Sequence, residues 1–142
     1  LLGLTMIKDV LITKLKVINT PGGNVMHAMK ETSPGYDGFG EAYFSLVRKG
    51  FIKSWRRHRR ATLNLVVPLG EVKFITTAKG ENFEEYILSS HDNFARLTVP
   101  PGLWLAFQGL QNEESIILNI SDRAHQGKEI DRCDLSDFSY DW

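Results

Sequence analysis

The sequence has little of what several protein classes require. Only one cysteine, Cys133, occurs in the 142 residues, so these residues cannot form a disulfide, and a lone thiol is typical of a reducing cytoplasm. No apolar run approaches the roughly 20 residues that a membrane-spanning helix needs. The 17 basic and 17 acidic residues cancel, so no global field attracts nucleic acid or an acidic membrane. We therefore expect a cytoplasmic protein that binds neither nucleic acid nor membranes.

The motifs of the common cofactor-dependent and metal-dependent enzymes are also missing. The sequence contains no G-x-S-x-G, no phosphate-binding loop, no G-x-G-x-x-G, no H-E-x-x-H and no C-x-x-C. Its histidines are scattered, and no two of them have the i, i+2 or i, i+4 spacing of metal ligands. We therefore expect no metal site.

Helix signals are sparse, and only the stretch from 24 to 31 is a helix candidate. Elsewhere, short runs of β-branched and aromatic residues are broken by glycine, proline, asparagine and aspartate, which is typical of strands and turns. Strands spaced at roughly 8–12 residues indicate a sandwich or barrel, so we predict an all-β, antiparallel fold. The expected strands are Val10–Ile18, Gly40–Val47, Ile52–Trp55, Thr62–Pro68, Glu71–Thr76, Glu84–Leu88, Ala95–Val99, Trp104–Gly109 and Ser115–Ser121.

No repeat, low-complexity segment or linker divides the chain. We therefore expect residues 1–142 to form one domain, a size that can close one core. The five residues Leu1–Thr5 precede Met6 and are too short and uncharged for a signal peptide. We interpret them as a leader or a vector-derived remnant.

The densest charged feature is a basic run around His58. On a regular strand, Ser54, Arg56, His58 and Arg60 share one face, and Lys53, Trp55, Arg57 and Arg59 share the other. If the first face lines a barrel, two arginines that suit phosphate and a histidine that titrates near neutrality point into one cavity. From the residues alone, a solvated basic edge strand is the slightly better explanation of the run, and a nucleic-acid-binding segment is a third one with weaker support.

Five segments in this order resemble a known family: Phe39–Ser45, Gly50–His58, Val66–Val72, Val99–Trp104 and Tyr140–Trp142. Together they resemble the dTDP-4-dehydrorhamnose 3,5-epimerases and their shorter relatives. The resemblance implies a cupin jelly-roll barrel, a homodimer, no cofactor, and a nucleoside-diphosphate 4-keto-6-deoxy sugar as substrate. In that family a histidine base removes a proton next to the ketone, a lysine stabilises the enolate, and a tyrosine returns a proton from the other face.

The family's catalytic residues carry over only in part. The base histidine falls on Arg56, the phosphate-side arginine on Lys53, and the aspartate that supports the base on Asp141. An arginine is a poor base because its pKa lies above about 12. His58 is two residues further along the strand, so it shares the face of Arg56 and is the candidate for the base.

Other parts of the family's proton machinery have no counterpart. The enolate-stabilising lysine falls near Thr62 or Leu63, the acid tyrosine near Leu118 or Asn119, and the histidine after P-P-G on Leu105. The related sugar 3,4-ketoisomerases carry H-x-H where this chain has Arg56-x-His58, so ketoisomerase chemistry is an alternative. A cupin that binds a nucleotide sugar without catalysis is a second alternative.

The resulting hypothesis is an epimerase or isomerase of a nucleoside-diphosphate 4-keto-6-deoxy sugar, acting in the synthesis of surface polysaccharide or a related glycoside. We expect Arg56, His58 and Asp141 to meet in the barrel mouth, with His58 as the acid or base. The residues expected to bind the substrate are Lys53, Arg60, Tyr43, Ser45, Asn64 and Asn119.

Overall fold

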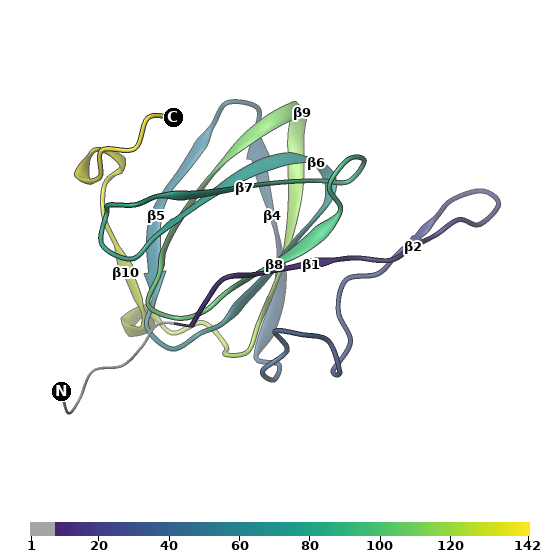
Figure 1. Ribbon diagram of the computed structural model, residues 1–142, viewed down its shortest axis with the longest axis horizontal. Coiled ribbons are helices and arrows are strands. Elements are labelled where there is room, and N and C mark those ends of the chain that lie inside the picture. The colour runs from purple at the N-terminus through teal and green to yellow at the C-terminus, as the bar shows by residue number, and fades with distance from the viewer. Residues whose placement is uncertain (1–7) are drawn as a thin grey trace.

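A computed structural model describes residues 8–142, so the expected leader Leu1–Thr5 lies outside the described residues. The described chain is built almost entirely of strands, with 3-10 turns at Gly127–Glu129 and Leu135–Asp137 (Figure 1). The strands are β1 (Leu11–Lys14), β2 (Val17–Ile18), β3 (Val25–Met26), β4 (Glu41–Arg48), β5 (Ile52–His58), β6 (Leu63–Thr77), β7 (Glu84–Ser89), β8 (Ala95–Val99), β9 (Trp104–Ser121) and β10 (Ile130–Arg132).

Two long strands replace pairs of shorter ones that the sequence predicts. The expected strands on either side of Gly70 form the single strand β6, and the last two expected strands form β9. The pairing of β6 with β9 shifts register around Leu69 and Glu71, so the expected turn is a set of bulges that bend the strand. Gly70 has a φ of 91°, and an added Cβ would lie 2.1 Å from Oγ of Ser115, so this bend requires glycine.

All pairings between the named strands are antiparallel, which confirms the predicted fold class. The first half of β6 pairs with β8, which pairs with β1, and the second half of β9 pairs with β4. The second half of β6 pairs with β7, and the first half of β9 pairs with β5, which pairs with β10. Because β6 and β9 run through both halves, they join two layers into a barrel.

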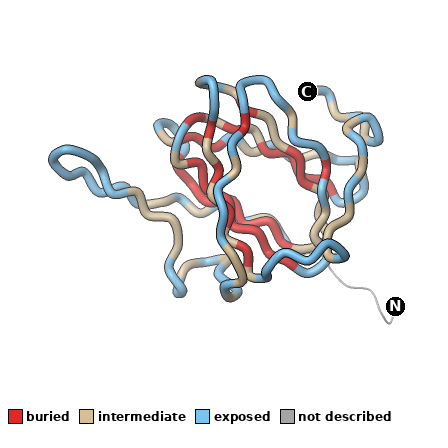
Figure 2. Tube along the Cα trace, turned by 180° about the vertical axis from the view of Figure 1, so that it is seen from behind, coloured by how far each residue is buried: buried red, intermediate tan, exposed pale blue. Residues whose placement is uncertain are grey.

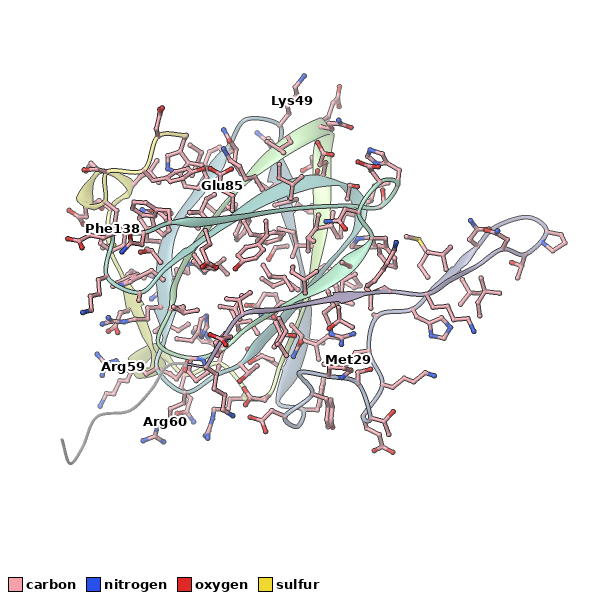
Figure 3. All side chains as sticks on the ribbon, viewed as in Figure 1. Met29, Lys49, Arg59, Arg60, Glu85 and Phe138 are labelled. Atoms are coloured by element: carbon pink, nitrogen blue, oxygen red, sulfur yellow. The ribbon has the colours of Figure 1, made fainter. Side chains whose placement is uncertain are left out.

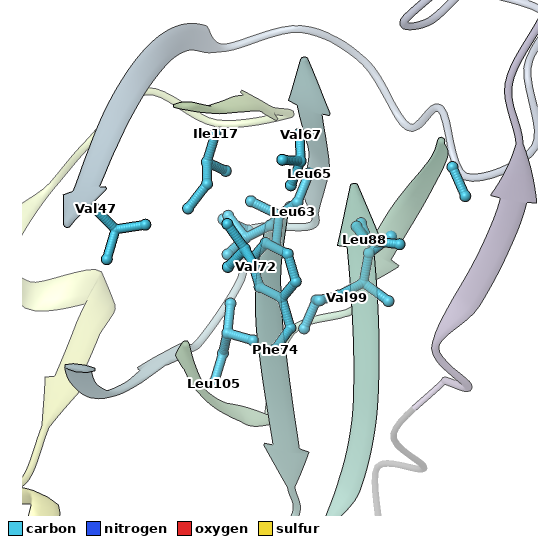
Figure 4. Packing of buried hydrophobic residues seen from close by; sticks show 13 residues of the cluster. Val47, Leu63, Leu65, Val67, Val72, Phe74, Leu88, Val99, Leu105 and Ile117 are labelled. Atoms are coloured by element: carbon cyan, nitrogen blue, oxygen red, sulfur yellow. The ribbon is translucent and has the colours of Figure 1, made fainter. Parts of the chain in front are cut away.

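The core lies between these two layers. Leu65, Leu97 and Ile117 come from one layer, and Phe74 and Leu88 from the other, and all are buried in one cluster (Figure 4). Figure 2 shows the buried residues along the strands of both layers, with exposed residues at the loops. Four residues of this cluster, Leu63, Leu65, Leu105 and Ile117, also line a polar cavity inside the barrel.

The stretch from 24 to 31 is not helical, contrary to the expectation for this segment. Val25–Met26 forms β3 and pairs with β2, which makes a hairpin that projects from the barrel (Figure 1). The glycines at 22 and 23, both with positive φ, form the turn of this hairpin and so favour strand over helix.

The C-terminal segment docks on the outer side of β5. Trp55 is buried there, and the rings of Phe138 and Trp142 lie with centroids 5.1 and 6.0 Å from its ring. Tyr140 packs on Trp142 with ring centroids 4.8 Å apart. The aromatic residues at the end of the chain thus cover a second apolar cluster, separate from the core.

Candidate functional site

The barrel holds a cavity of about 120 Å³ between β4 and β5. Its walls are β4 and β5, which belong to different layers and do not pair with each other in the part of the chain that the structure describes. Its apolar lining comes from β6 (Leu63, Leu65) and β9 (Leu105, Phe107, Ile117). Its polar lining consists of Tyr43 and Ser45 from β4, Lys53, Ser54, Arg56 and His58 from β5, and Asn119 from β9. Six of the predicted site residues therefore lie around one cavity.

A bulge in β5 decides which cations face this cavity. Lys53 pairs with Phe107 and Arg56 pairs with Leu105, so Ser54 and Trp55 together oppose the single residue Ala106. The extra residue breaks strict alternation and puts Lys53 on the same side as Arg56. The prediction that Lys53 lies on the opposite face from Arg56 and His58 is therefore wrong, because a regular strand was assumed.

His58 is held by a carboxylate that the sequence analysis did not identify. Nδ1 of His58 lies 2.9 Å from Oε2 of Glu129, and their side chains are only 15% and 10% exposed. The contact forms because β10 pairs with β5 and brings the residues before Ile130 beside His58. An ionised Glu129 accepts the Nδ1 proton, which leaves the Nε2 lone pair for a ligand.

Glu129 is itself held in place by the backbone. Its Oε1 accepts the backbone N–H groups of Arg60 at 2.6 Å and Ala61 at 2.7 Å. Burial acts to raise the pKa of Glu129, but these two hydrogen bonds and His58 together outweigh burial, and the pKa lies below its usual value. Glu129 therefore stays ionised near neutrality and can orient the imidazole of His58.

Asp141 does not line the cavity, contrary to the expectation that it meets Arg56 and His58 there. Its neighbours Tyr140 and Trp142 pack with Trp55 on the outer side of β5, and this docking carries Asp141 away from the mouth. The carboxylate beside His58 is therefore Glu129, from the 3-10 turn before β10.

Arg60 and Asn64 also lie outside the cavity lining. The Arg60 side chain is exposed and points away from the barrel (Figure 3). Asn64 is buried on the outer side of β6, where it donates to the carbonyl of Gly35 and accepts from Thr98. Asn64 thus fastens the loop before β4 to the barrel, a structural role that its residue type alone does not reveal.

Asn119 and Tyr43 meet on the wall opposite β5. They are direct partners in the pairing of β4 with β9, and Nδ2 of Asn119 donates to Oη of Tyr43 at 3.0 Å. Oδ1 of Asn119 is buried and has no hydrogen-bond partner among the described residues. A buried polar atom without a partner is costly, so this oxygen favours a ligand with a hydroxyl or amide donor.

Two further properties concern metals and membranes. Within residues 8–142, no three His, Cys, Asp or Glu side chains gather where they could hold a metal ion. Over the same residues, no helix has the length and apolar character needed to cross a membrane.

The free thiol of Cys133 is half-buried, and burial together with Asp137 and Asp134 raises its pKa.

With this geometry in place, solved structures provide the comparison. The sequence matches no protein-family model and no curated protein. A dTDP sugar isomerase from Desulfovibrio desulfuricans G20 superposes with a TM-score of 0.90 at 26% identity, over 96% of this chain and 92% of that chain. The chain has the cupin jelly-roll fold. The same fold occurs in solved structures of a dTDP sugar isomerase and of deoxysugar epimerases.

Two more cupins extend the comparison. The sugar 3,4-ketoisomerase QdtA from Thermoanaerobacterium thermosaccharolyticum, in complex with TDP, has a TM-score of 0.76 at 18% identity, over 90% of each chain. The 3,5-epimerase RmlC from Legionella pneumophila, in complex with dTDP-4-keto-L-rhamnose, has a TM-score of 0.80 at 18% identity, over 97% of this chain and 80% of that chain. At these identities the likeness establishes the cupin fold.

Proposed function

We propose that this cupin is an isomerase that moves protons on a nucleoside-diphosphate 4-keto-6-deoxy sugar, in the synthesis of surface polysaccharide or a related glycoside. The observation that carries the proposal is the pair of His58 and Glu129 at the mouth of a cavity that also holds Lys53 and Arg56. The likeness to a dTDP sugar isomerase over nearly the whole chain supports the substrate class.

His58 acts as the base in this proposal. Glu129 accepts its Nδ1 proton, so the lone pair of Nε2 takes the proton from the carbon next to the ketone. The electron pair left behind forms an enolate, whose negative charge rests on the ketone oxygen. Lys53 and Arg56 line the same cavity, and a fixed positive charge near that oxygen stabilises the enolate without rearranging.

Lys53 and Arg56 also offer a place for the diphosphate. Besides lining the cavity, they line a crevice of about 390 Å³ beside the bulge of β5, together with Arg132. A diphosphate carries negative charges that suit arginine forks and a lysine ammonium. In this arrangement the sugar occupies the inner cavity, and the diphosphate lies towards the cations at its edge.

A 3,4-ketoisomerase is the second candidate. The chain spans 90% of the ketoisomerase QdtA but 80% of the epimerase RmlC, so its length is nearer that of the ketoisomerase. The two reactions share the first step, removal of a proton from C3, and differ in the carbon that receives a proton afterwards. A cupin that binds a nucleotide sugar without catalysis remains an outcome of the experiment below.

The proposal includes a homodimer. Phe44, Leu46 and Leu69 are 69%, 50% and 50% exposed, and the pairing register puts Leu46 and Leu69 on either side of Ile116 in one row across the sheet. A second copy would cover this apolar row and the projecting β2–β3 hairpin, since an isolated hairpin is only marginally stable in water.

We also place the protein in the cytoplasm. Its one cysteine, Cys133, is a free thiol, and free thiols are typical of reducing compartments.

The experiment compares wild-type protein with His58→Asn, and His91→Asn serves as a control because His91 is exposed and lies outside the cavity. Each protein is incubated with dTDP-4-keto-6-deoxyglucose, and ¹³C NMR locates the product's carbonyl, which stays at C4 in an epimer and moves to C3 in a ketoisomer. We expect His58→Asn to lose conversion while calorimetry shows unchanged dTDP affinity. Binding by the wild type without conversion would contradict the proposed catalysis.

A further inference from the structure

The bulge in β5 is supported from the side opposite β9. The position of a bulge decides which side chains of a strand point into the barrel, so whatever fixes the bulge also fixes them. β10 pairs with β5 from Arg56 to His58 and ends before the bulge at Ser54 and Trp55. This pairing brings Cys133, the residue after β10, beside the bulge.

The backbone of Cys133 bonds to both bulge residues. Its N–H donates to the carbonyl of Trp55 at 3.3 Å, and its carbonyl accepts the hydroxyl of Ser54 at 2.9 Å. A shift of the bulge by one residue would separate both pairs of atoms. The two bonds therefore specify which residues of β5 form the bulge.

Cys133 is itself fixed on both sides along the chain. Before it, β10 pairs with β5. After it, Asp134 and Asp137 form a capping box, in which the side chain of each accepts the backbone N–H of the other. Phe138 then packs on Trp55 with ring centroids 5.1 Å apart. The segment that follows β10 is thus held firmly enough to support the bulge.

The orientation of Lys53 depends on this support more than that of Arg56 does. Arg56 pairs with Leu105 on one side and with Arg132 on the other, so two strands hold it. Lys53 pairs with Phe107 and lies beyond the end of β10. Without the extra residue of the bulge, strict alternation would put Lys53 and Arg56 on opposite faces of β5.

We propose that Ser54 is a positioning residue for the diphosphate of the substrate, and that its bond to the C-terminal segment keeps Lys53 on the cavity side of β5. This inference rests on the proposed function and concerns its binding step. Lys53 and Arg56 line both the cavity and the crevice at its edge, so a diphosphate there meets both cations. The C-terminal segment lies outside the cavity and still takes part in binding.

The test is Ser54→Ala, with the affinity for dTDP measured by calorimetry. The lost hydrogen bond is exposed and joins two uncharged groups, so the variant should fold, and we expect the Kd to rise about 3–10-fold. Ser54→Thr keeps the hydroxyl and should bind dTDP as the wild type does. Ser136→Ala is the control, because Ser136 is exposed in the same segment and lines neither the cavity nor the crevice.

A double mutant separates positioning from direct contact. Ser54 also lines the cavity, and a hydroxyl that touched dTDP would contribute whether or not Lys53 is present. A residue that acts through Lys53 has no such effect in Lys53→Ala, so adding Ser54→Ala to that variant should change its Kd by less than about 2-fold. With dTDP-4-keto-6-deoxyglucose, Ser54→Ala should raise KM and leave kcat unchanged.

Wild-type affinity in Ser54→Ala would overturn the inference, and so would an equal loss with and without Lys53. Equal weakening by Ser54→Thr and Ser54→Ala, or a fall in kcat at unchanged KM, would also contradict it. The proposed function fails separately: a wild type that binds dTDP and converts no keto sugar loses the catalysis but keeps the positioning role. Full affinity in Lys53→Ala would remove the role of Ser54 together with the diphosphate site.

Discussion

At the scale of single residues, the account depends on the contact between His58 and Glu129. A histidine acts as a base through one ring nitrogen only when the other is occupied, and the carboxylate of Glu129 does this at 2.9 Å. The backbone N–H groups of Arg60 and Ala61 fix that carboxylate in turn. The chain thus builds a histidine–carboxylate pair from residues 71 positions apart.

Glu129→Gln tests this contact. The amide keeps the size of the side chain but loses the charge that favours the Nδ1–H tautomer, so we expect kcat to fall by about 10–100-fold. The affinity for dTDP, measured by calorimetry, should change little, because Glu129 is not proposed to touch the nucleotide. Asp131→Asn on the neighbouring strand β10 is the control, and equal kcat values for Glu129→Gln and wild type would contradict the role of Glu129.

The sequence led to His58 but could not lead to Glu129. His58 and Arg56 share a cavity face because they are two apart on a strand, and this spacing is readable in the sequence. The position of Glu129 depends on which strand the short β10 joins, and nothing local in a polar, acidic tail specifies that pairing. The family resemblance had assigned the support of the histidine to Asp141. In the structure, the aromatic neighbours of Asp141 pack on Trp55, and Asp141 lies outside the cavity.

At the scale of elements, bulges explain where the sequence prediction of strands departs from the structure. The positions of most strands follow from β-branched runs between turn residues. The bulge at Ser54 and Trp55 and the bends near Gly70 do not, because a bulge depends on the partner strand. The bulge in β5 has the larger functional effect, since it brings Lys53 into the cavity with Arg56.

The same bulge turns Trp55 outward, into the cluster that holds the C-terminal segment. Trp55→Ala should lower the free energy of unfolding by about 3–5 kcal/mol, as is usual when a buried aromatic side chain is removed. Urea denaturation measures this loss. Ile87→Ala, on the exposed side of β7, should cost much less, and comparable losses for both variants would contradict the docking of the C-terminal segment on Trp55.

The pairing of β5 with β10 predicts a pH dependence. Hydrogen bonds from Arg59 and Arg57 lower the pKa of Asp131 to about 2, from an unfolded value near 3.8. A lowered pKa stabilises the fold above pH 3.8, and this contribution disappears as the pH falls towards 2. Asp131→Asn should therefore be slightly less stable than wild type at pH 6, by less than about 1 kcal/mol because the pair is exposed. Thermal melts should show this difference vanish near pH 2, and a constant difference would contradict the prediction.

At the scale of the whole molecule, the two layers of the cupin barrel determine which strands surround the cavity. β6 and β9 run through both layers and supply the apolar lining of the cavity, and β4 and β5 supply most of its polar lining. The fold class was predictable because alternating strands and turns extend along the chain. The exposed row of Phe44, Leu46 and Leu69 and the projecting hairpin could be recognised only in three dimensions.

The proposed dimer gives a prediction at this scale. Leu46→Asp introduces a charge into the apolar row, where burial against a second copy would desolvate it. We expect sedimentation at micromolar concentration to show a dimer for the wild type and a monomer for the variant. Lys49→Asp places the same charge on an exposed position after β4 and should leave the dimer intact. A monomeric wild type would contradict the proposed assembly.

The central claim is that the cavity removes a proton from a keto sugar through His58. Its most direct test is ¹H NMR of dTDP-4-keto-6-deoxyglucose in deuterated water with catalytic amounts of protein. The account predicts that the wild type replaces the C3 proton, in an epimerase also the C5 proton, with deuterium, and that His58→Asn binds dTDP but replaces neither. No exchange with the wild type, or exchange at the wild-type rate with His58→Asn, would contradict it.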